Sequence, residues 1–225
     1  MRTALRSTLI ASISLFAALL TLAAPLRAQP FRVFDGHDEY VYMVAFAENG
    51  QSMVTASGDN TAILWNTRQR SAVHVLPHDA AVYAAAVSPD GMLIATGCGD
   101  GRVSLWNSRN GSCIDSTNQH DDAVYCVAFS PDGSRLATAG GSTDGGDTVC
   151  RIWQTNDLQL TAELTGHRRQ IYGVVFSPDG QTVATSSSDK TIRLWNSVSG
   201  ESSVLNGHTS DVYRCVFSPD GKRLA

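Results

Sequence analysis

The pentapeptide "FSPDG" occurs at residues 129–133, 176–180 and 217–221, and "VSPDG" stands in its place at 87–91. Successive prolines of this motif are 42, 47 and 41 residues apart. The four tryptophans repeat with steps of 41, 47 and 42 residues, and five of the six histidines keep a similar spacing. A fixed period of about 20 to 50 residues is typical of proteins built from repeated structural units. The sequence therefore predicts a series of such units.

Each unit alternates short runs of β-branched and aromatic residues with Gly, Pro, Asp and Ser, which is typical of short antiparallel strands joined by tight turns. We expect strands at 182–186, at 191–195 and near 201–205, and the next unit opens with an expected strand at 212–217. "SPDG" is the expected turn after the first strand, because Pro fixes φ early in the turn and Gly accepts the positive φ that closes it. The Phe before it is expected to anchor the strand in the core between neighbouring sheets.

Each unit opens with a His that usually follows Gly, and a Trp closes its third strand. With these marks, residues 31–225 resemble the WD40 repeat family. The family's Trp-Asp dipeptide is replaced by Trp-Asn at three tryptophans and by Trp-Gln at one. The resemblance implies an all-β fold, an incomplete β-propeller of four-stranded antiparallel blades, with four full repeats and a fifth that ends inside its second strand. Residues 31–34, "FRVF", resemble the lone fourth strand that completes the last blade in this family.

The composition is that of a packed protein. Of the 225 residues, 43% are hydrophobic and 17% are charged, which is enough apolar material for a large core. The formal net charge is −4, and it would be more negative without the arginines of the first 28 residues. This acidity argues against DNA, RNA or anionic lipid as the main partner.

Residues 1–28 form a separate segment, with two early arginines and then a run without charge from residue 7 to residue 26. This pattern predicts a secretory signal peptide, cleaved after Ala28 or near Ala23 and Ala24. An uncleaved membrane anchor is the alternative, because the run approaches the ~20 apolar residues that a bilayer requires. In either case we expect the repeat region, residues 31–225, to be exported, into the periplasm or the extracellular space if the source is bacterial.

Every complete unit also repeats a His, a Thr, an Asp and a Trp, with the Asp six residues before the Trp. Such a set could be read as a nucleophile, base and acid, but four copies of one active site would be unusual. The family resemblance implies instead a buried hydrogen-bond chain, in which Asp orients His, Thr bridges and the indole N–H finds an acceptor. The four sets are His37, Thr55, Asp59 and Trp65; His78, Thr96, Asp100 and Trp106; His120, Thr138, Asp147 and Trp153; and His167, Thr185, Asp189 and Trp195.

The cysteines follow no pattern of a zinc site. They occupy different places in different repeats, their number is odd, and no CxxC motif occurs. Export would permit disulfides, but we interpret the cysteines as scattered core residues, because a free Cys behaves as a small buried hydrophobic residue. They are Cys98, Cys113, Cys126, Cys150 and Cys215.

The long step of 47 residues comes from "GGSTDGGD", residues 140–147, which lengthens the turn between the second and third strands. The segment is expected to emerge beside the loop of His120, because Asp147 has to meet that histidine. Its Asp and Gly content is compatible with calcium, but it lacks the acidic pattern and the terminal Glu of a known calcium loop. We interpret it as a flexible insertion.

The segments just after the opening histidines vary in charge, being acidic in the first and third units and basic in the fourth. A face of mixed charge suits a protein partner, although ordinary solvated loops would look the same. A Tyr recurs in every first strand, either as packing between blades or as an interface anchor. The residue after it varies and is a candidate for specificity: Met43, Ala84, Cys126, Gly173 and Arg214. The candidate partner-binding residues are Asp38, Glu39, Met43, Asp121, Asp122, Arg168, Arg169 and Arg214.

These features predict an exported, non-catalytic scaffold that binds an unidentified protein or peptide, without a cofactor or a metal ion. The alternative is an accessory or sensor domain of a larger protein, such as an enzyme. A membrane is expected as a partner only if the leader is retained, and the oligomeric state is not predicted. An open propeller leaves a bare strand edge and an uncovered apolar face. We therefore expect a fragment of a longer protein, with self-assembly of open arrays as the alternative.

Overall fold

The computed structural model describes residues 33–142 and 144–225. The chain divides into two units, residues 1–34 and residues 35–225, and all strands of the described residues lie in the second unit. None of the described residues forms a helix that could cross a membrane. The predicted leader, residues 1–28, lies outside the described residues, as do residues 31 and 32 of the predicted lone strand, while Val33 and Phe34 belong to no strand.

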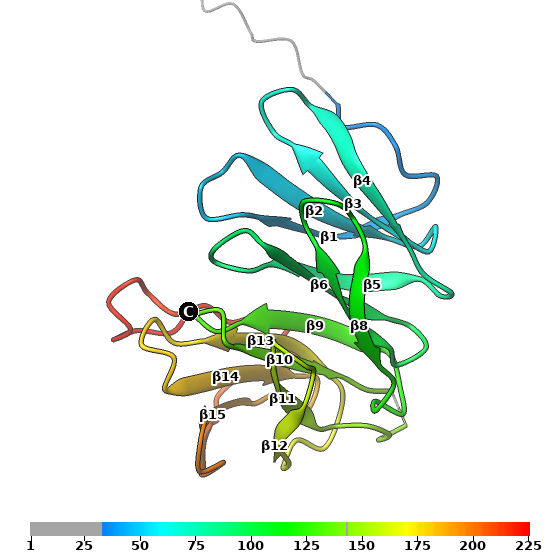
Figure 1. The fold of residues 1–225 in the computed structure, drawn as a ribbon. Helices are drawn as coiled ribbons and strands as arrows, with labels where there is room; N and C mark the ends of the chain where they lie inside the picture. Colours follow the sequence, from blue (N-terminus) through cyan, green and yellow to red (C-terminus); the bar gives the residue numbers. More distant parts are fainter. Residues whose placement is uncertain (1–32, 143) are drawn as a thin grey trace, which may run out of the picture. The chain divides into compact units, whose positions relative to one another are not determined.

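The described residues form four sheets of four antiparallel strands, with the strands of each sheet in chain order (Figure 1). We call these sheets blades one to four. Blade one comprises β1 (Val41–Phe46), β2 (Ser52–Ser57), β3 (Thr61–Asn66) and β4 (Ser71–Pro77). Blade two comprises β5 (Val82–Val87), β6 (Leu93–Cys98), β7 (Val103–Asn107) and β8 (Cys113–Thr117). Blade three comprises β9 (Val124–Phe129), β10 (Arg135–Gly140), β11 (Cys150–Gln154) and β12 (Leu160–Leu164). Blade four comprises β13 (Ile171–Phe176), β14 (Thr182–Ser187), β15 (Ile192–Asn196) and β16 (Ser202–Leu205). The predicted all-β fold of four-stranded antiparallel blades is confirmed.

The core lies between successive blades. The first strands are neighbours, β1 of β5, β5 of β9 and β9 of β13. Three clusters of buried apolar side chains join blades one and two, two and three, and three and four, and the Trp of the later blade belongs to each cluster. These are Trp106, Trp153 and Trp195. Each blade therefore covers one face of the next.

The "SPDG" segments form the predicted turns between the first and second strands. In blade three, the N–H of Gly133 donates to the carbonyl of Ser130 at 2.8 Å, and Gly133 has a φ of 71°. The hydroxyl of Ser130 also accepts the N–H of Arg135 at 3.0 Å. Blade one keeps this turn although its sequence is "AENG", because Gly50 retains the positive φ, at 63°.

The Phe residues before these turns are not all core anchors. Phe176 is 5% exposed within the cluster between blades three and four, and Phe129 packs partly buried against the cluster between blades two and three. Phe46 of β1 is 63% exposed. The prediction is wrong for Phe46, because no sheet in the described part of the chain covers that face of β1 as blade one covers β5.

The strand expected at 212–217 is not formed. The described residues show there an isolated bridge between Phe217 and Leu224. Backbone hydrogen bonds join Val216 to Ala225 and Ser218 to Arg223, so pairing is limited to the residues nearest the turn. A strand requires ladder partners along its length. On the side that faces residues 223–225, such partners exist for residues 216–218 but not for residues 212–215.

All five cysteines lie in the described residues and are free thiols. Cys98, Cys126 and Cys150 are buried, which agrees with their interpretation as core residues. Cys113 is exposed on the outer strand of blade two, so the interpretation is wrong at that position. Burial raises the pKa of Cys98 and of Cys150 to about 12, which keeps both thiols protonated at neutral pH.

Candidate functional site

Blade four shows the repeated hydrogen-bond chain in its simplest form. Nδ1 of His167 lies 2.8 Å from Oδ2 of Asp189, and its Nε2 lies 2.7 Å from the hydroxyl of Thr185. The indole N–H of Trp195 donates to the same hydroxyl at 2.8 Å. A carboxylate only accepts, so His167 donates through Nδ1, and the ring accepts the Thr hydroxyl at Nε2. Burial lowers the pKa of His167 despite the nearby Asp189, which favours this neutral ring.

Blade one contains the same chain. His37 lies 2.8 Å from Asp59 through Nδ1 and 2.6 Å from Thr55 through Nε2. Trp65 donates its indole N–H to the hydroxyl of Thr55 at 2.8 Å. In both blades the hydrogen-bond chain connects the loop before the first strand, the turn after the second strand and the buried indole.

The carboxylates of these chains also hold the backbone of the variable loops. Asp59 accepts the N–H of Asp38 at 3.0 Å, and Asp189 accepts the N–H of Arg168 at 3.1 Å. Burial alone would raise the pKa of Asp59 and Asp189, but hydrogen bonds from Thr, His and backbone groups outweigh burial and lower each pKa to about 2. Both groups are therefore ionised at neutral pH, and each fixes the first residue of a variable loop while the side chain of that residue faces solvent.

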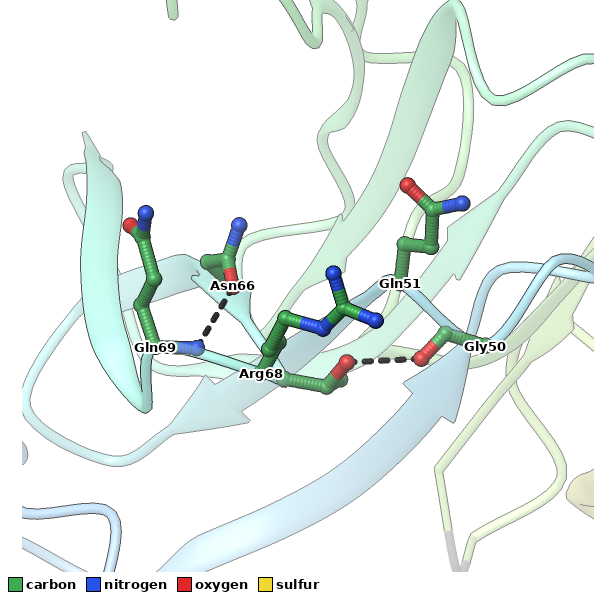
Figure 2. A pocket seen from close by; sticks show the side chains of 6 residues that line it. Gly50, Gln51, Asn66, Arg68 and Gln69 are labelled. Carbon is green, nitrogen blue, oxygen red and sulfur yellow. Dashed lines mark hydrogen bonds between the residues drawn. The ribbon is translucent and has the colours of Figure 1, made fainter.

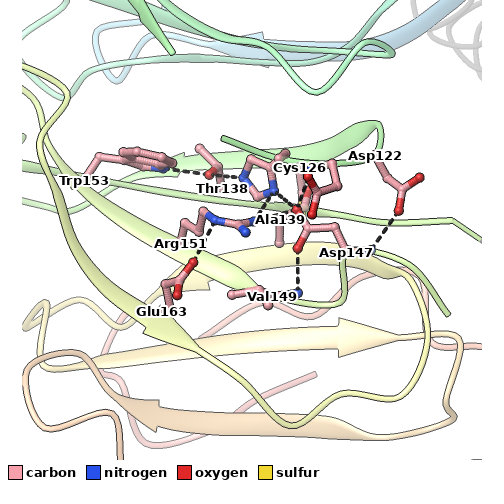
Figure 3. Close-up of polar contacts among 11 residues, drawn as sticks. Asp122, Cys126, Thr138, Ala139, Asp147, Val149, Arg151, Trp153 and Glu163 are labelled. Carbon is pink, nitrogen blue, oxygen red and sulfur yellow. Dashed lines mark hydrogen bonds and ion pairs between the residues drawn. The ribbon is translucent and has the colours of Figure 1, made fainter. Parts of the chain in front are cut away.

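In blade three the chain is more deeply buried. Nδ1 of His120 lies 2.7 Å from Asp147, and Nε2 lies 2.8 Å from Thr138, which accepts the indole N–H of Trp153 at 2.7 Å (Figure 3). The side chains of His120 and Asp147 are 1% and 2% exposed. The insertion at 140–147 therefore ends beside the loop of His120.

In blade three an arginine also pairs with the Asp of the hydrogen-bond chain. Blade four has Arg193 at the same position, where it donates to the hydroxyl of Ser202 at 3.4 Å, and blade one has Ile63 there. Nη1 of Arg151 donates to Asp147 at 2.5 Å, and Nε donates to Glu163 at 3.1 Å (Figure 3). Burial alone would raise the pKa of Asp147, but His120 and Arg151 outweigh it and lower the pKa. Asp122, a candidate partner-binding residue, accepts the N–H of Asp147 at 2.7 Å, so its carboxylate also serves the local fold.

Blade two departs from the expected set. His78 lies 2.8 Å from Thr96 through Nε2, and Trp106 donates to Thr96 at 2.9 Å. Asp100 does not reach His78: it accepts the N–H of Arg102 at 3.1 Å and faces the Arg102 guanidinium at 3.8 Å. Nδ1 of His78 is buried without a hydrogen-bond partner among the described residues. The expectation that Asp100 orients His78 is therefore wrong.

The residue two positions after the Asp is an arginine in blade two alone among the four blades. In blades one and four it is Thr61 and Thr191, and each hydroxyl donates at 2.6 Å to the carboxylate oxygen that does not face the histidine. In blade two it is Arg102, whose guanidinium attracts Asp100. The substitution of Thr by Arg is visible in the sequence and is the signal that could have identified the exception.

The recurring tyrosines form a continuous row across the first strands. Neighbouring ring centroids are 4.9, 5.3, 5.9 and 5.1 Å apart in chain order. The four tyrosines of the blades each lie at a register shift, where the first strand has one residue more than the second. Such bulges turn a side chain away from the regular pleat. The row consists of Tyr42, Tyr83, Tyr125, Tyr172 and Tyr213.

These five tyrosines and Arg214 line an open groove of about 380 Å³. Tyr42 and Tyr213, at the ends of the row, are 48% and 65% exposed. Nη2 of Arg214 lies 3.3 Å from the sulfur of Met43, so residues from the two ends of the repeat region are in contact. The tyrosines therefore contact one another between blades and also present a shared surface.

The residues after the tyrosines are not equally available for binding. Ala84, Cys126 and Gly173 are buried, and Met43 packs partly buried against the cluster between blades one and two. Only Arg214 is exposed among the five. The specificity prediction is wrong for the three buried residues, because strand neighbours point to opposite faces and the residue after each Tyr points into the core. Five other candidates are exposed in their loops: Asp38, Glu39, Asp121, Arg168 and Arg169.

A different hollow, of about 430 Å³, lies at the opposite end of blade one, between its β1–β2 and β3–β4 turns (Figure 2). Thr67 donates to the carbonyl of Gly50 at 2.6 Å, and the N–H of Gln69 donates to Asn66 at 2.8 Å, so these groups serve the turns themselves. No three His, Cys, Asp or Glu side chains of residues 33–142 and 144–225 could jointly hold a metal ion. The lining residues are Gly50, Gln51, Asn66, Thr67, Arg68 and Gln69.

Antiparallel four-stranded blades with adjacent first strands, connected by buried His, Thr and Trp chains, define a repeat protein of the β-propeller class. The model of the family "WD domain, G-beta repeat" matches residues 28–66, 70–107, 111–154, 158–196 and 200–225. The chain belongs to this WD40 repeat family. The matches starting at residues 70, 111 and 158 run from the outer strand of one blade to the third strand of the next, so each of these sequence repeats connects two sheets. No curated protein matches the chain significantly. WD40 repeats indicate a protein-interaction scaffold and are generally non-catalytic.

Proposed function

We propose that the chain is an exported, non-catalytic scaffold that binds a protein or peptide through its histidine-loop face, which comprises residues 37–40, 78–81, 120–123, 167–170 and 208–211. One observation carries this proposal. The carboxylates that hold His37 and His167 also hold the backbone of the first variable loop residue, at 3.0 and 3.1 Å. Loops that start from a fixed base lose less entropy on binding, and their differing charges select a complementary partner.

Site-specific photo-cross-linking tests the face. A benzophenone amino acid replacing Asp121 or Arg169 in the full chain should cross-link to one partner, whereas the same group at Gln181, exposed at the other end of blade four, should not. The partner, identified by mass spectrometry and purified, should bind the unmodified chain, and Arg169→Glu should change its affinity by about threefold to tenfold. Cross-linking from Gln181 alone, or no effect of Arg169→Glu and of Asp121→Lys on affinity, would place the binding face elsewhere.

Export is supported by the charge-free run in residues 1–28, which lie outside the described residues. Expressed in a Gram-negative host, the chain is expected in the periplasm with a new N-terminus after Ala28 or near Ala23 and Ala24, as measured by mass spectrometry of the intact protein. A variant without residues 2–28 serves as the control and should stay in the cytoplasm. Recovery of the intact chain from the cytoplasm would contradict export, and its recovery from the membrane would contradict cleavage.

The uncovered face of β1 supports a further part of the proposal: the blades work within a larger assembly, in which other β-structure covers β1. Val44 and Phe46 are 49% and 63% exposed, whereas the first strands of blades two to four pack against the preceding blade. The covering sheet could come from the same protein or from a second copy of this chain, and both would bury Phe46.

A further inference from the structure

Arg193 of β15 occupies the position that Arg151 has in β11, but its guanidinium contacts different groups. Arg151 pairs with Asp147 and, through Nε at 3.1 Å, with Glu163 (Figure 3). None of the ion pairs between described residues includes Arg193. Its Nη1 lies 3.4 Å from the hydroxyl of Ser202, and its Nε is buried without a hydrogen-bond partner among the described residues. Because buried polar groups nearly always have a partner, this guanidinium has room for an acceptor from outside the chain.

The difference between the two arginines comes from the neighbouring outer strand. Arg151 stands opposite Glu163 of β12, and Arg193 stands opposite Val204 of β16. Val204 is 38% exposed, and its side chain cannot accept a hydrogen bond. Blade four therefore lacks, at this position, the carboxylate that serves Nε of the arginine in blade three.

Asp189 does not take over this role, because its oxygens already accept other hydrogen bonds. Oδ2 accepts from Nδ1 of His167 at 2.8 Å and from the N–H of Arg168 at 3.1 Å. Oδ1 accepts the hydroxyl of Thr191 at 2.6 Å and its N–H at 3.0 Å. The carboxylate is thus committed to the hydrogen-bond chain and to the loop, and its distance from the guanidinium exceeds that of an ion pair.

A hollow of about 330 Å³ lies over the Arg193 guanidinium, at the histidine-loop end of blade four. The exposed side chain of Arg168 and the amide of Asn206 also line it. A Cβ atom at Gly166 would lie 2.7 Å from Nη1 of Arg193, so the glycine leaves space for the guanidinium. The ring of Trp195 lies on another side, with its centroid 5.5 Å from Cζ. The hollow therefore holds one guanidinium in place and offers further donors beside it.

The charge of this hollow is opposite to that of the same place in blade three. Blade four has two guanidinium groups and one carboxylate there, whereas blade three has one guanidinium and three carboxylates. The four positions are those of Arg168, Asp189, Arg193 and Val204, and their counterparts are Asp121, Asp147, Arg151 and Glu163. The hollow is thus positive, although the whole chain has a formal net charge of −4.

We infer that this hollow binds a carboxylate of the partner, an Asp or Glu side chain in an acidic segment, which takes the place that Glu163 has in blade three. The inference rests on the proposed function, because Arg168 belongs to the histidine-loop face. A guanidinium presents its N–H groups in a planar fork that matches a carboxylate, and Arg168 adds a second positive charge. The negative charge of the whole chain disfavours an acidic segment elsewhere, so the hollow determines where the segment docks.

Fluorescence anisotropy of the full chain with labelled hexaglutamate tests the inference. Arg193→Lys keeps the charge but loses the fork, and it should weaken binding by about threefold to tenfold. Arg168→Gln should have a similar effect. Arg169→Gln is the matched control, because Arg169 is exposed in the same loop but does not line the hollow, and it should change the affinity by less than about twofold at about 0.15 M salt. Equal effects of Arg168→Gln and Arg169→Gln would overturn the inference.

Val204→Glu supplies the missing carboxylate from within the chain. The new side chain should pair with Arg193 and weaken hexaglutamate binding by about tenfold, whereas Val204→Gln adds a similar shape without the charge and should retain binding. Nitrogen–proton correlation spectra of the arginine side chains observe the site directly. The Nε–H signal of Arg193, assigned by its loss in Arg193→Lys, should move when hexaglutamate is added and in Val204→Glu without it. A signal that stays in place at saturating hexaglutamate would contradict the assigned site.

The remaining outcomes separate the ligand chemistry from the proposed function. Tighter binding of a labelled phosphoserine peptide of equal charge would overturn the carboxylate in favour of phosphate. A cross-linked partner with the same affinity for Val204→Glu, Arg193→Lys and the unmodified chain would overturn this inference alone, while the proposed function would stand. Hexaglutamate binding as expected, without any cross-linked partner, would contradict the proposed function and leave the carboxylate site in place.

Discussion

Asp147→Ala is expected to lower the free energy of unfolding by about 3 to 5 kcal/mol, because it removes one partner of a buried ionic group. Asp147 contacts both His120, at 2.7 Å, and Arg151, at 2.5 Å, and its side chain is 2% exposed. Its loss leaves the Arg151 guanidinium, 9% exposed, with Glu163 at the rim as its remaining carboxylate partner. Urea denaturation followed by tryptophan fluorescence measures the change, because Trp153 terminates the same chain.

Asp100→Ala is the control at the equivalent position of blade two. Asp100 makes one backbone hydrogen bond and a distant contact with Arg102, and it does not contact His78. Its replacement should cost about 0.5 to 1 kcal/mol, the net value of a single hydrogen bond. Asp189→Ala should fall between the two, because that carboxylate contacts a buried His and the backbone of Arg168, and its ion pair is with His167 rather than with a guanidinium. Equal losses at Asp100 and Asp147 would show that the hydrogen-bond chains of the two blades do not differ as described.

The difference between Asp100 and Asp147 separates the features that the sequence could predict from those that it could not. The turns at "SPDG" depend on local chemistry, and the Gly of each copy, at residues 91, 133, 180 and 221, has a positive φ. Strands, turns and the repeat period could therefore be predicted without any tertiary information. The position of Asp100 depends on the side chain of Arg102, which competes with His78 for the carboxylate. A repeat pattern treats equivalent positions as equal and misses such competition.

The tyrosine groove was harder to predict for a related reason. The tyrosines were identified, but their rings form a groove only because a bulge in each first strand turns them together. Bulges depend on pairing between two strands and leave no clear mark in one of them. The residue after each Tyr was assigned to specificity because it varies, yet Ala84 and Cys126 vary inside the core, where small apolar side chains exchange at little cost.

Phe176→Ala is expected to lower the free energy of unfolding by about 3 to 5 kcal/mol, the usual cost of removing a buried Phe side chain. Phe176 is 5% exposed and packs in the cluster that joins blades three and four, together with Val183 and Trp195. The cavity would lie between two sheets, so the loss should separate blade four from blade three. Thermal unfolding followed by circular dichroism, with urea denaturation for the free energy, measures the effect.

Phe46→Ala changes the residue at the equivalent position of blade one and tests whether β1 is covered. Phe46 is 63% exposed in the described structure, so its replacement should change stability by less than about 0.5 kcal/mol when the chain is a monomer. If other β-structure covers β1 in the working protein, the same substitution should cost several kcal/mol there and lower the sedimentation coefficient of any oligomer. A loss near zero in both the isolated chain and its native assembly would mean that β1 remains an open face, and the proposal of a covering sheet would be wrong. The comparison with Phe176 separates burial from residue type, because both phenylalanines stand immediately before the same turn.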